Sequence, residues 1–184
     1  MTAFSSIPVI LALAIGVADG PTVTKHLTIA ASVSPAAAAP GARVSLVLEI
    51  TPKPAMHVYA PEQKDYIPIS LALEANAAVK AHVIQFPKPE KRVLKDLGET
   101  QLVYSKPFRI VQDVTMASRG VLDRAATAGG RITIKGALKY QACDDSICYA
   151  PVTVPVAWTI DLHPTAHNTR GGDPDVQRAA QVTR

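Results

Sequence analysis

The two cysteines of the chain, Cys143 and Cys148, carry its clearest capacity for chemistry. Residues 131–140 before them and 152–160 after them alternate polar and apolar side chains and are rich in β-branched residues. This alternation predicts two strands, so residues 144–147 form the connection of a hairpin. Residues that face each other across a hairpin have Cα atoms roughly 4.5–5.5 Å apart, which suits a disulfide. The sequence therefore predicts a Cys143–Cys148 bridge at the hairpin tip.

The role of such a bridge can be weighed by the loop that it closes. In the chain-entropy model, closing a loop of about six residues stabilises a fold by roughly 2 kcal/mol, which is less than closing a long loop does. This bridge joins neighbours and lies at a turn, where the thiol of a partner protein can reach it. Reversible thiol–disulfide chemistry is therefore the first interpretation, and a structural staple and a metal-binding thiol pair stay as alternatives.

Two acidic residues, Asp144 and Asp145, lie between the cysteines. Their negative charge disfavours a neighbouring thiolate, and Lys135 and Lys139 oppose it only from nearby on the preceding strand. A destabilised thiolate in the reduced form makes the disulfide harder to reduce. The charge pattern therefore predicts a reducing dithiol that hands electrons on.

The chain as a whole favours an all-β fold. Its 184 residues are the length of one domain, and 48 % of them are hydrophobic, which is enough for a core. Val, Ile and Thr are frequent, there are 15 prolines, and helix signals are scarce. Alternating segments predict about eight short strands, at 22–31, 43–50, 56–60, 67–73, 79–86, 108–116, 131–140 and 152–160. Strands of this kind close into an immunoglobulin-like β-sandwich, with the redox cysteine pair on one hairpin.

The segments between these strands are read from their composition. Residues 32–41 are small and predict a connection, residues 90–101 are charged and predict an irregular segment, and residues 125–130 predict a turn. Trp158 is expected in the core. The net charge of +4 is small, and the basic residues are scattered without aromatic interleaving, which argues against nucleic-acid binding.

The two ends of the chain differ from the domain between them. Residues 7–17 form an apolar run of signal-peptide length that is too short to span a bilayer, and Gly16 and Ala18 suit a cleavage site. An uncleaved anchor or a misassigned start codon is the alternative, because residues 1–6 contain no Lys or Arg. We expect a periplasmic or secreted protein, where disulfides persist. Its parts would be a signal peptide at 1–20, a domain at 21–163 and a disordered polar tail at 164–184.

The cysteine hairpin resembles that of a known family. Tyr-Gln-Ala-Cys at 140–143, the acidic residue that follows, and Cys-Tyr-Ala-Pro at 148–151 are similar to the redox hairpin of the N-terminal periplasmic domain of the thiol:disulfide interchange protein DsbD. Residues 57–61 and 66–69 also resemble segments of standalone relatives of that domain. The resemblance covers about residues 25–162.

The resemblance implies an immunoglobulin-like domain that accepts electrons from a membrane-embedded partner by way of a thioredoxin-like domain. It also implies that the domain passes them to periplasmic thioredoxin-fold proteins, including disulfide isomerases and cytochrome c maturation factors. Cys148 would then form the mixed disulfide with partners, and Cys143 would resolve it. The activity would be that of a protein-disulfide reductase, and this chemistry needs no cofactor.

Three features depart from the family pattern. Four residues separate the cysteines, where the best-known member has five. The family shields its cysteine pair with a phenylalanine in a cap loop, whereas the matching residues 94–98 offer only leucines. The family protein also carries a transmembrane domain and a thioredoxin domain, which we expect to be separate partner proteins here, among them a DsbD-like membrane protein.

Further side chains are candidates for supporting roles. Tyr59, Tyr140 and Tyr149 are candidates for surrounding the cysteines and limiting the access of solvent, and the alternative is that they are simply half-buried at strand ends. Asp96, in the cap-like loop with Glu99, is a candidate for proton transfer to a departing thiolate, and a solvated loop face is the favoured alternative.

Two other functions remain as alternatives. One is a non-enzymatic periplasmic binding module in which the disulfide is only a staple. The other is a copper-binding protein in which His57 joins the two cysteines, a ligand set that suits copper. The favoured alternative for His57 is a strand histidine that only packs or forms hydrogen bonds. The sequence contains no His-x-x-His motif to support a metal site, and no motif of a hydrolase.

Overall fold

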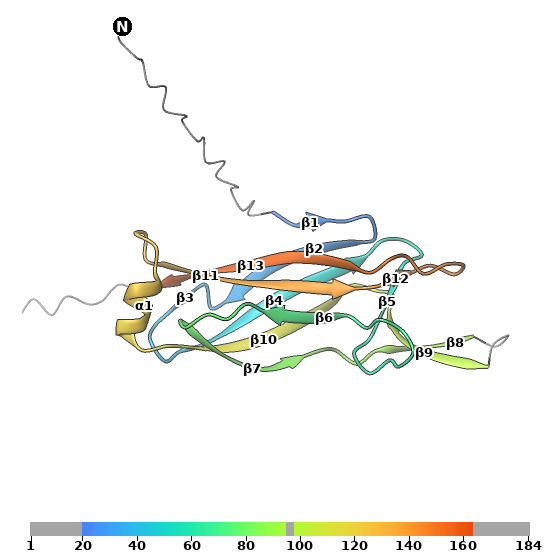
Figure 1. Ribbon diagram of the computed structural model, residues 1–184, viewed down its shortest axis with the longest axis horizontal. Helices are drawn as coiled ribbons and strands as arrows, with labels where there is room; N and C mark the ends of the chain where they lie inside the picture. Colours follow the sequence, from blue (N-terminus) through green and yellow to red (C-terminus); the bar gives the residue numbers. More distant parts are fainter. Residues whose placement is uncertain (1–19, 95–97, 164–184) are drawn as a thin grey trace, which may run out of the picture.

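Strands with one buried face dominate the chain and assemble into an elongated sandwich (Figure 1). The computed structural model describes residues 20–94 and 98–163. The predicted signal peptide, apart from its last residue, the predicted polar tail and Asp96 lie outside these residues. Within the described ranges, no helix has the length and apolar character needed to cross a membrane.

A five-stranded antiparallel sheet forms the first layer, in the order β1-β2-β4-β10-β7. The central strands β4 and β10 keep one register, from Arg43 opposite Thr115 to Ile50 opposite Phe108. The five strands are β1 (Thr22–Val23), β2 (Leu27–Ser34), β4 (Arg43–Pro52), β7 (Val79–Gln85) and β10 (Phe108–Met116).

A four-stranded sheet forms the second layer, in the order β3-β13-β11-β6. β11 and β13 pair from Arg131 opposite Asp161 to Tyr140 opposite Val152, so the chain turns back over residues 141–151. The four strands are β3 (Ala37–Ala38), β6 (Ser70–Leu73), β11 (Arg131–Tyr140) and β13 (Val152–Leu162). The helix α1 (Arg119–Ala125) links β10 to β11.

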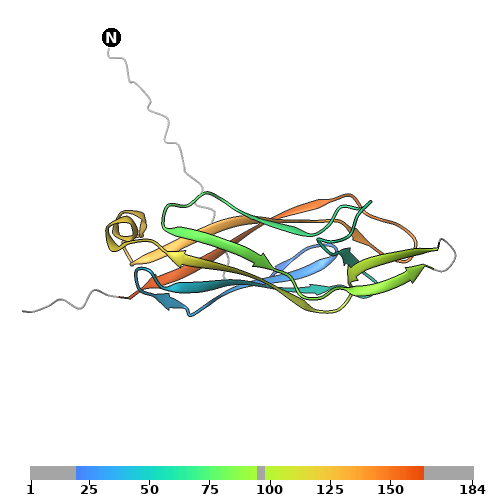
Figure 2. The ribbon, with the colours of Figure 1, turned by 90° about the horizontal axis from the view of Figure 1, so that it is seen from below.

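A second four-stranded sheet, in the order β12-β5-β9-β8, lies at the end of the molecule opposite α1 (Figures 1 and 2). Its strands are β5 (His57–Tyr59), β8 (Glu90–Leu94), β9 (Glu99–Tyr104) and β12 (Ala142–Cys143). Because only one residue separates β11 from β12, the chain leaves the second layer and joins this small sheet as it enters the cysteine hairpin. The small sheet therefore positions the cysteines.

Alternation along the long strands supplies the core between the layers. The inward residues of both layers form one buried cluster, which includes Val44, Leu46, Leu48, Ile50, Ile132, Ile134, Leu138 and Ile160. Trp158 is buried as predicted, and its indole Nε1 donates a hydrogen bond to the carbonyl oxygen of Val47 at 3.0 Å. Since these two residues belong to different layers, this bond ties the layers together. The predicted all-β sandwich is confirmed.

The β8–β9 hairpin was not expected, because residues 90–101 had been predicted to be irregular. β8 is an edge strand that turns Arg92 toward the cysteine hairpin and leaves Val93 61 % exposed. A strand with a charge on its inner face and an apolar side chain outside reverses the pattern by which half-buried strands are recognised.

Two smaller differences have local causes. The strand predicted at 22–31 is divided into β1 and β2 by a turn, in which the Oγ1 of Thr24 accepts a hydrogen bond from the backbone N–H of Leu27 at 2.8 Å. The helix α1 escaped prediction because its signals are weak: Ser118 is a usual N-cap residue, but the helix has only 7 residues, Gly120 lies in its first turn, and no acidic residue is found there. Burial of Leu122 holds the helix in place.

Candidate functional site

The cysteine hairpin closes as the sequence predicts. Cys143 and Cys148 oppose each other in an antiparallel bridge and form a disulfide, with their Cα atoms 4.0 Å apart. The turn between them is held by Asp144, whose Oδ1 accepts hydrogen bonds from the backbone N–H groups of Ser146 (2.7 Å) and Ile147 (2.8 Å). These bonds hold the pKa of the Asp144 carboxyl below its usual value. The loop is therefore ordered by an ionised aspartate.

The two sulfurs differ in their exposure. Cys143 belongs to β12 and is 1 % exposed, whereas Cys148 lies outside the strand and is exposed. Cys143 packs in a small buried cluster with Tyr59 and Val103, and Tyr66 packs against this cluster. A thiolate of another protein therefore reaches Cys148 more readily than Cys143.

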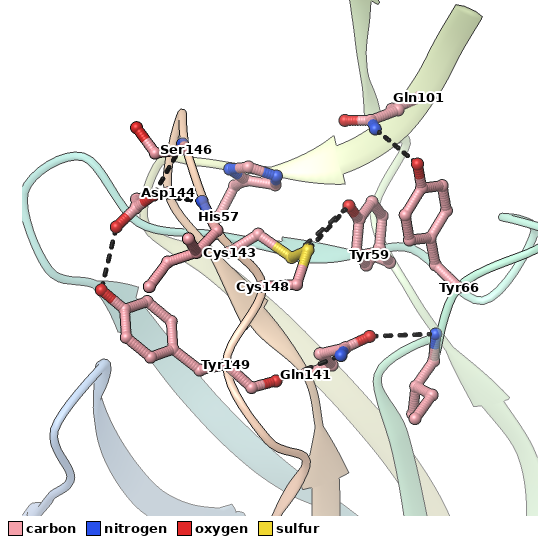
Figure 3. Close-up of a disulfide and its surroundings, with 12 residues drawn as sticks. His57, Tyr59, Tyr66, Gln101, Gln141, Cys143, Asp144, Ser146, Cys148 and Tyr149 are labelled. Carbon is pink, nitrogen blue, oxygen red and sulfur yellow. Dashed lines mark hydrogen bonds between the residues drawn. A yellow bond between two sulfur atoms is a disulfide. The ribbon is translucent and has the colours of Figure 1, made fainter.

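Tyr59 covers the disulfide from β5 (Figure 3). Its hydroxyl oxygen lies 3.5 Å from the Sγ of Cys143 and 3.6 Å from the Sγ of Cys148. Disulfide sulfurs carry no proton, so the hydroxyl is the donor. Burial raises the pKa of Tyr59 to about 12, which keeps the hydroxyl protonated at neutral pH. The predicted place of Tyr59 beside the cysteines agrees with this geometry.

A second tier of polar groups supports Tyr59. The ring of Tyr66 stacks on that of Tyr59, with centroids 4.2 Å apart. The Tyr66 hydroxyl donates to Glu99 Oε2 and accepts a hydrogen bond from Gln101 Nε2, each at 3.2 Å. Sequence reasoning did not single out Tyr66 or Gln101. Their position beside the site comes from the β8–β9 hairpin and the loop after β5, which no local pattern places there.

Tyr149 and Asp145 occupy the other side of the hairpin. The Tyr149 hydroxyl donates to Asp144 Oδ2 at 2.9 Å, and this bond raises the pKa of Tyr149. Asp145 forms an ion pair with Arg92 of β8. Arg92 is thus a cation that balances the negative charge of the loop, beside Lys135 and Lys139, which the sequence had suggested for this role. The sequence alone did not single out Arg92.

Tyr140 lies away from the disulfide, whereas Leu94 of the cap-like loop lies near it. Tyr140 is fully buried in the sandwich core, and its hydroxyl lies 2.9 Å from Thr24 Oγ1, so it stands apart from the hydrogen bonds around the disulfide. Leu94, which the sequence offers in place of the family's phenylalanine, lines a cavity of about 140 Å³ together with both cysteines.

His57 lies directly opposite Cys143 in the pairing of β5 with β12. Its Nδ1 is 2.9 Å from the Nη1 of Arg92, and its Nε2 is buried without a hydrogen-bond partner among the described residues. Burial lowers the pKa of His57, and the charge of Arg92 lowers it further. The described residues contain no group of three or more His, Cys, Asp or Glu side chains that could hold a metal ion.

The comparison with protein families decides where this site belongs. Residues 27–158, from the start of β2 into β13, match the family described as the N-terminal part of the thiol:disulfide interchange protein DsbD. The chain belongs to this family. As a member of the DsbD N-terminal family it is an immunoglobulin-like β-sandwich and a thiol–disulfide exchange domain, and its cysteine hairpin is the part of the sequence that resembled the family.

Comparisons with individual proteins add less. None of the curated proteins is similar enough to the chain to count as a match. Among solved structures, the chain is similar to the N-terminal periplasmic domain of ScsB from Proteus mirabilis, with 13 % sequence identity and a TM-score of 0.47. The similarity covers 78 % of this chain and 50 % of that one, so the chain spans half the length of this relative.

Proposed function

We propose that this domain relays reducing equivalents between thioredoxin-fold partners through the Cys143–Cys148 pair, outside the cytoplasm. The observation that carries the proposal is the asymmetry of the disulfide, with Cys148 exposed at a hairpin tip and Cys143 buried beneath Tyr59. A purely structural bridge has no need of one accessible sulfur. Membership of the DsbD N-terminal family supports both the chemistry and a periplasmic location.

In the proposed reaction, a thiolate of a reduced partner attacks the Sγ of Cys148. The Cys143–Cys148 bond breaks, a mixed disulfide forms between the partner and Cys148, and the electron pair leaves on the Sγ of Cys143. The second thiol of the partner then attacks the mixed disulfide and releases Cys148 as a thiolate, which leaves the partner oxidised and the domain reduced. The same steps in reverse reduce the disulfide of the next partner.

Asymmetric trapping tests the proposal and the role of each sulfur. The Cys143→Ser variant keeps the exposed sulfur and is expected to accumulate a mixed disulfide with a thioredoxin that lacks its own resolving cysteine and carries an aromatic disulfide on the other, because neither protein then has a thiol that can resolve the bond. The matched Cys148→Ser variant keeps only the buried sulfur and is expected to trap far less. Non-reducing gel electrophoresis with mass spectrometry reads both results.

The alternative is a binding module with a structural disulfide. To decide between the two, the unaltered domain is equilibrated with mixtures of reduced and oxidised thioredoxin, and free thiols are counted after alkylation. Ready equilibration supports the relay. A bond that stays oxidised under strongly reducing mixtures, together with no trapping by either variant, would replace the relay by the binding module.

A further inference from the structure

His57 is a buried polar neighbour of Cys143 that the proposed reaction does not use. It lies on β5 opposite Cys143, so its side chain and that of Cys143 are on the same face of the small sheet. His57 and both cysteines line the cavity of about 140 Å³. Figure 3 shows the three side chains together at the hairpin. The residue is 3 % exposed, so solvent does not satisfy its ring.

The hydrogen bond to Arg92 fixes the protonation state of the ring. A guanidinium group can only donate hydrogen bonds, so the Nδ1 of His57, 2.9 Å from Arg92 Nη1, must be the acceptor and carries no proton. The proton of the neutral imidazole is then on Nε2. This Nε2 is the buried ring atom that has no partner among the described residues. Arg92 itself is held by the ion pair with Asp145.

A buried donor without a partner is uncommon and calls for an explanation. In the oxidised domain, neither sulfur of the disulfide carries charge. When the disulfide opens, Cys143 becomes a thiolate in a site that solvent does not reach, and a thiolate there needs hydrogen-bond donors. Tyr59 supplies one donor, and its hydroxyl is shared between two sulfurs.

We propose that His57, held by Arg92 as the neutral Nε2–H tautomer, donates a hydrogen bond to the Cys143 thiolate released when the disulfide opens. The inference rests on the proposed exchange function. His57 acts as a donor and not as an acid, because loss of the Nε2 proton from a neutral ring would leave an imidazolate. No proton is transferred in this step, and the negative charge stays on sulfur.

This arrangement differs from a thiolate paired with an imidazolium. The charged groups around the ring are Arg92 on β8 and Asp144 and Asp145 in the hairpin loop, and Tyr59 faces it on its own strand with ring centroids 5.7 Å apart. Arg92 blocks protonation at Nδ1 by occupying it. Stabilisation of the thiolate therefore does not depend on the charge of His57, and it applies at every pH at which the thiolate is present.

The test measures the pKa of the Cys143 thiol in the full chain, by the ultraviolet absorbance of its thiolate. A Cys148→Ser background leaves Cys143 as the only thiol. His57→Phe, which removes the donor and keeps a flat ring, is expected to raise this pKa by about one unit, as the loss of one hydrogen bond to a charged group should. His57→Gln, which keeps an N–H donor, is expected to recover part of the shift. His82→Phe on β7, where the ring contacts Thr115 and not the site, is the matched control and should have no effect.

Nitrogen-15 NMR of the imidazole in the unaltered oxidised domain provides a second readout that does not depend on whether the variants fold. The Nε2–H tautomer is expected across the neutral range. In Arg92→Gln, the freed Nδ1 should take up a proton in mild acid, and a second ionisation should then appear in the thiolate titration. An unchanged thiol pKa in both His57 variants, or a proton on Nδ1 in the unaltered domain, would overturn the inference. Neither readout uses thioredoxin. Failure of the domain to exchange with thioredoxin would therefore refute the relay, and the hydrogen bond from His57 could still be tested.

Discussion

Replacing Tyr59 by phenylalanine removes the hydroxyl that lies 3.5 Å and 3.6 Å from the two sulfurs and keeps the ring that stacks on Tyr66. In the oxidised domain the lost bonds are weak, because a neutral disulfide sulfur is a poor acceptor, so the free energy of unfolding should fall by less than about 1 kcal/mol. In the reduced domain the same hydroxyl donates to a thiolate, and the loss is larger.

The size of that loss follows from the geometry. One hydroxyl proton can serve only one of the two sulfurs at a time, so a single bond to a charged group is lost, at the low end of about 1.5–3 kcal/mol. A loss of about 1.4 kcal/mol equals one pKa unit and about 30 mV for a two-electron couple. The Tyr59→Phe domain should therefore show a thiol pKa higher by about one unit. At a pH above the thiol pKa, the reduction potential of the Tyr59→Phe domain should be about 30 mV more negative than that of the unaltered domain.

The assay pairs thiolate absorbance, measured against pH, with equilibration against thioredoxin at a pH above the thiol pKa. Tyr66→Phe is the matched control, because it removes a hydroxyl that bonds to Glu99 and Gln101 and leaves the sulfurs untouched. If Tyr59→Phe and Tyr66→Phe behave alike, the hydroxyl of Tyr59 does not stabilise the reduced site, and the reasoning is wrong.

Two further predictions concern the loop and the sandwich. Hydrogen bonds from the backbone of Ile147 and Ser146 lower the pKa of Asp144. The ionised carboxylate therefore stabilises the fold at pH values above the ordinary carboxyl pKa, and this stabilisation is lost as the pH falls through the lowered pKa. Asp144→Asn should weaken the acid dependence of denaturant unfolding, and an unchanged acid slope would contradict this. Gly136→Ala should lower the free energy of unfolding by about 1–3 kcal/mol, because the new Cβ would lie 2.7 Å from the carbonyl oxygen of Ala72. Gly120→Ala, whose Cβ meets only Arg124 Nη1 at 3.7 Å, is the control and should be neutral or stabilising in thermal unfolding.

The parts of the site that were predicted from the sequence are those fixed by local pattern. The spacing of Cys143 and Cys148 between two alternating segments was enough to predict the bridge and the turn that bears Asp144. The sequence also offers Tyr59 as a neighbour of the cysteines, and its hydroxyl lies 3.5 Å from the Sγ of Cys143.

The parts that were missed depend on contacts between distant segments. Arg92 lies 53 residues from Asp145 in the chain, and its strand carries an inverted pattern, so nothing local marks it as the partner of the acidic loop. The sequence offers His57 only as a packed strand histidine or a metal ligand, because its pairing with Cys143 requires β12 to leave the second layer. Tyr140 was assigned to the site by its nearness in sequence, yet the alternation along β11 turns it into the core.

The position of β8 has a consequence for solubility. In the part of the chain that the structure describes, β8 pairs with β9 alone and ends the small sheet, at the edge opposite β12, so one row of its backbone groups is open. Open strand edges invite pairing between copies of a protein, and charged side chains discourage it. Glu90, Lys91 and Arg92 supply consecutive charges along this edge. The strand that brings Arg92 to the cysteine hairpin thereby also discourages pairing between copies of the domain along the open edge of its small sheet.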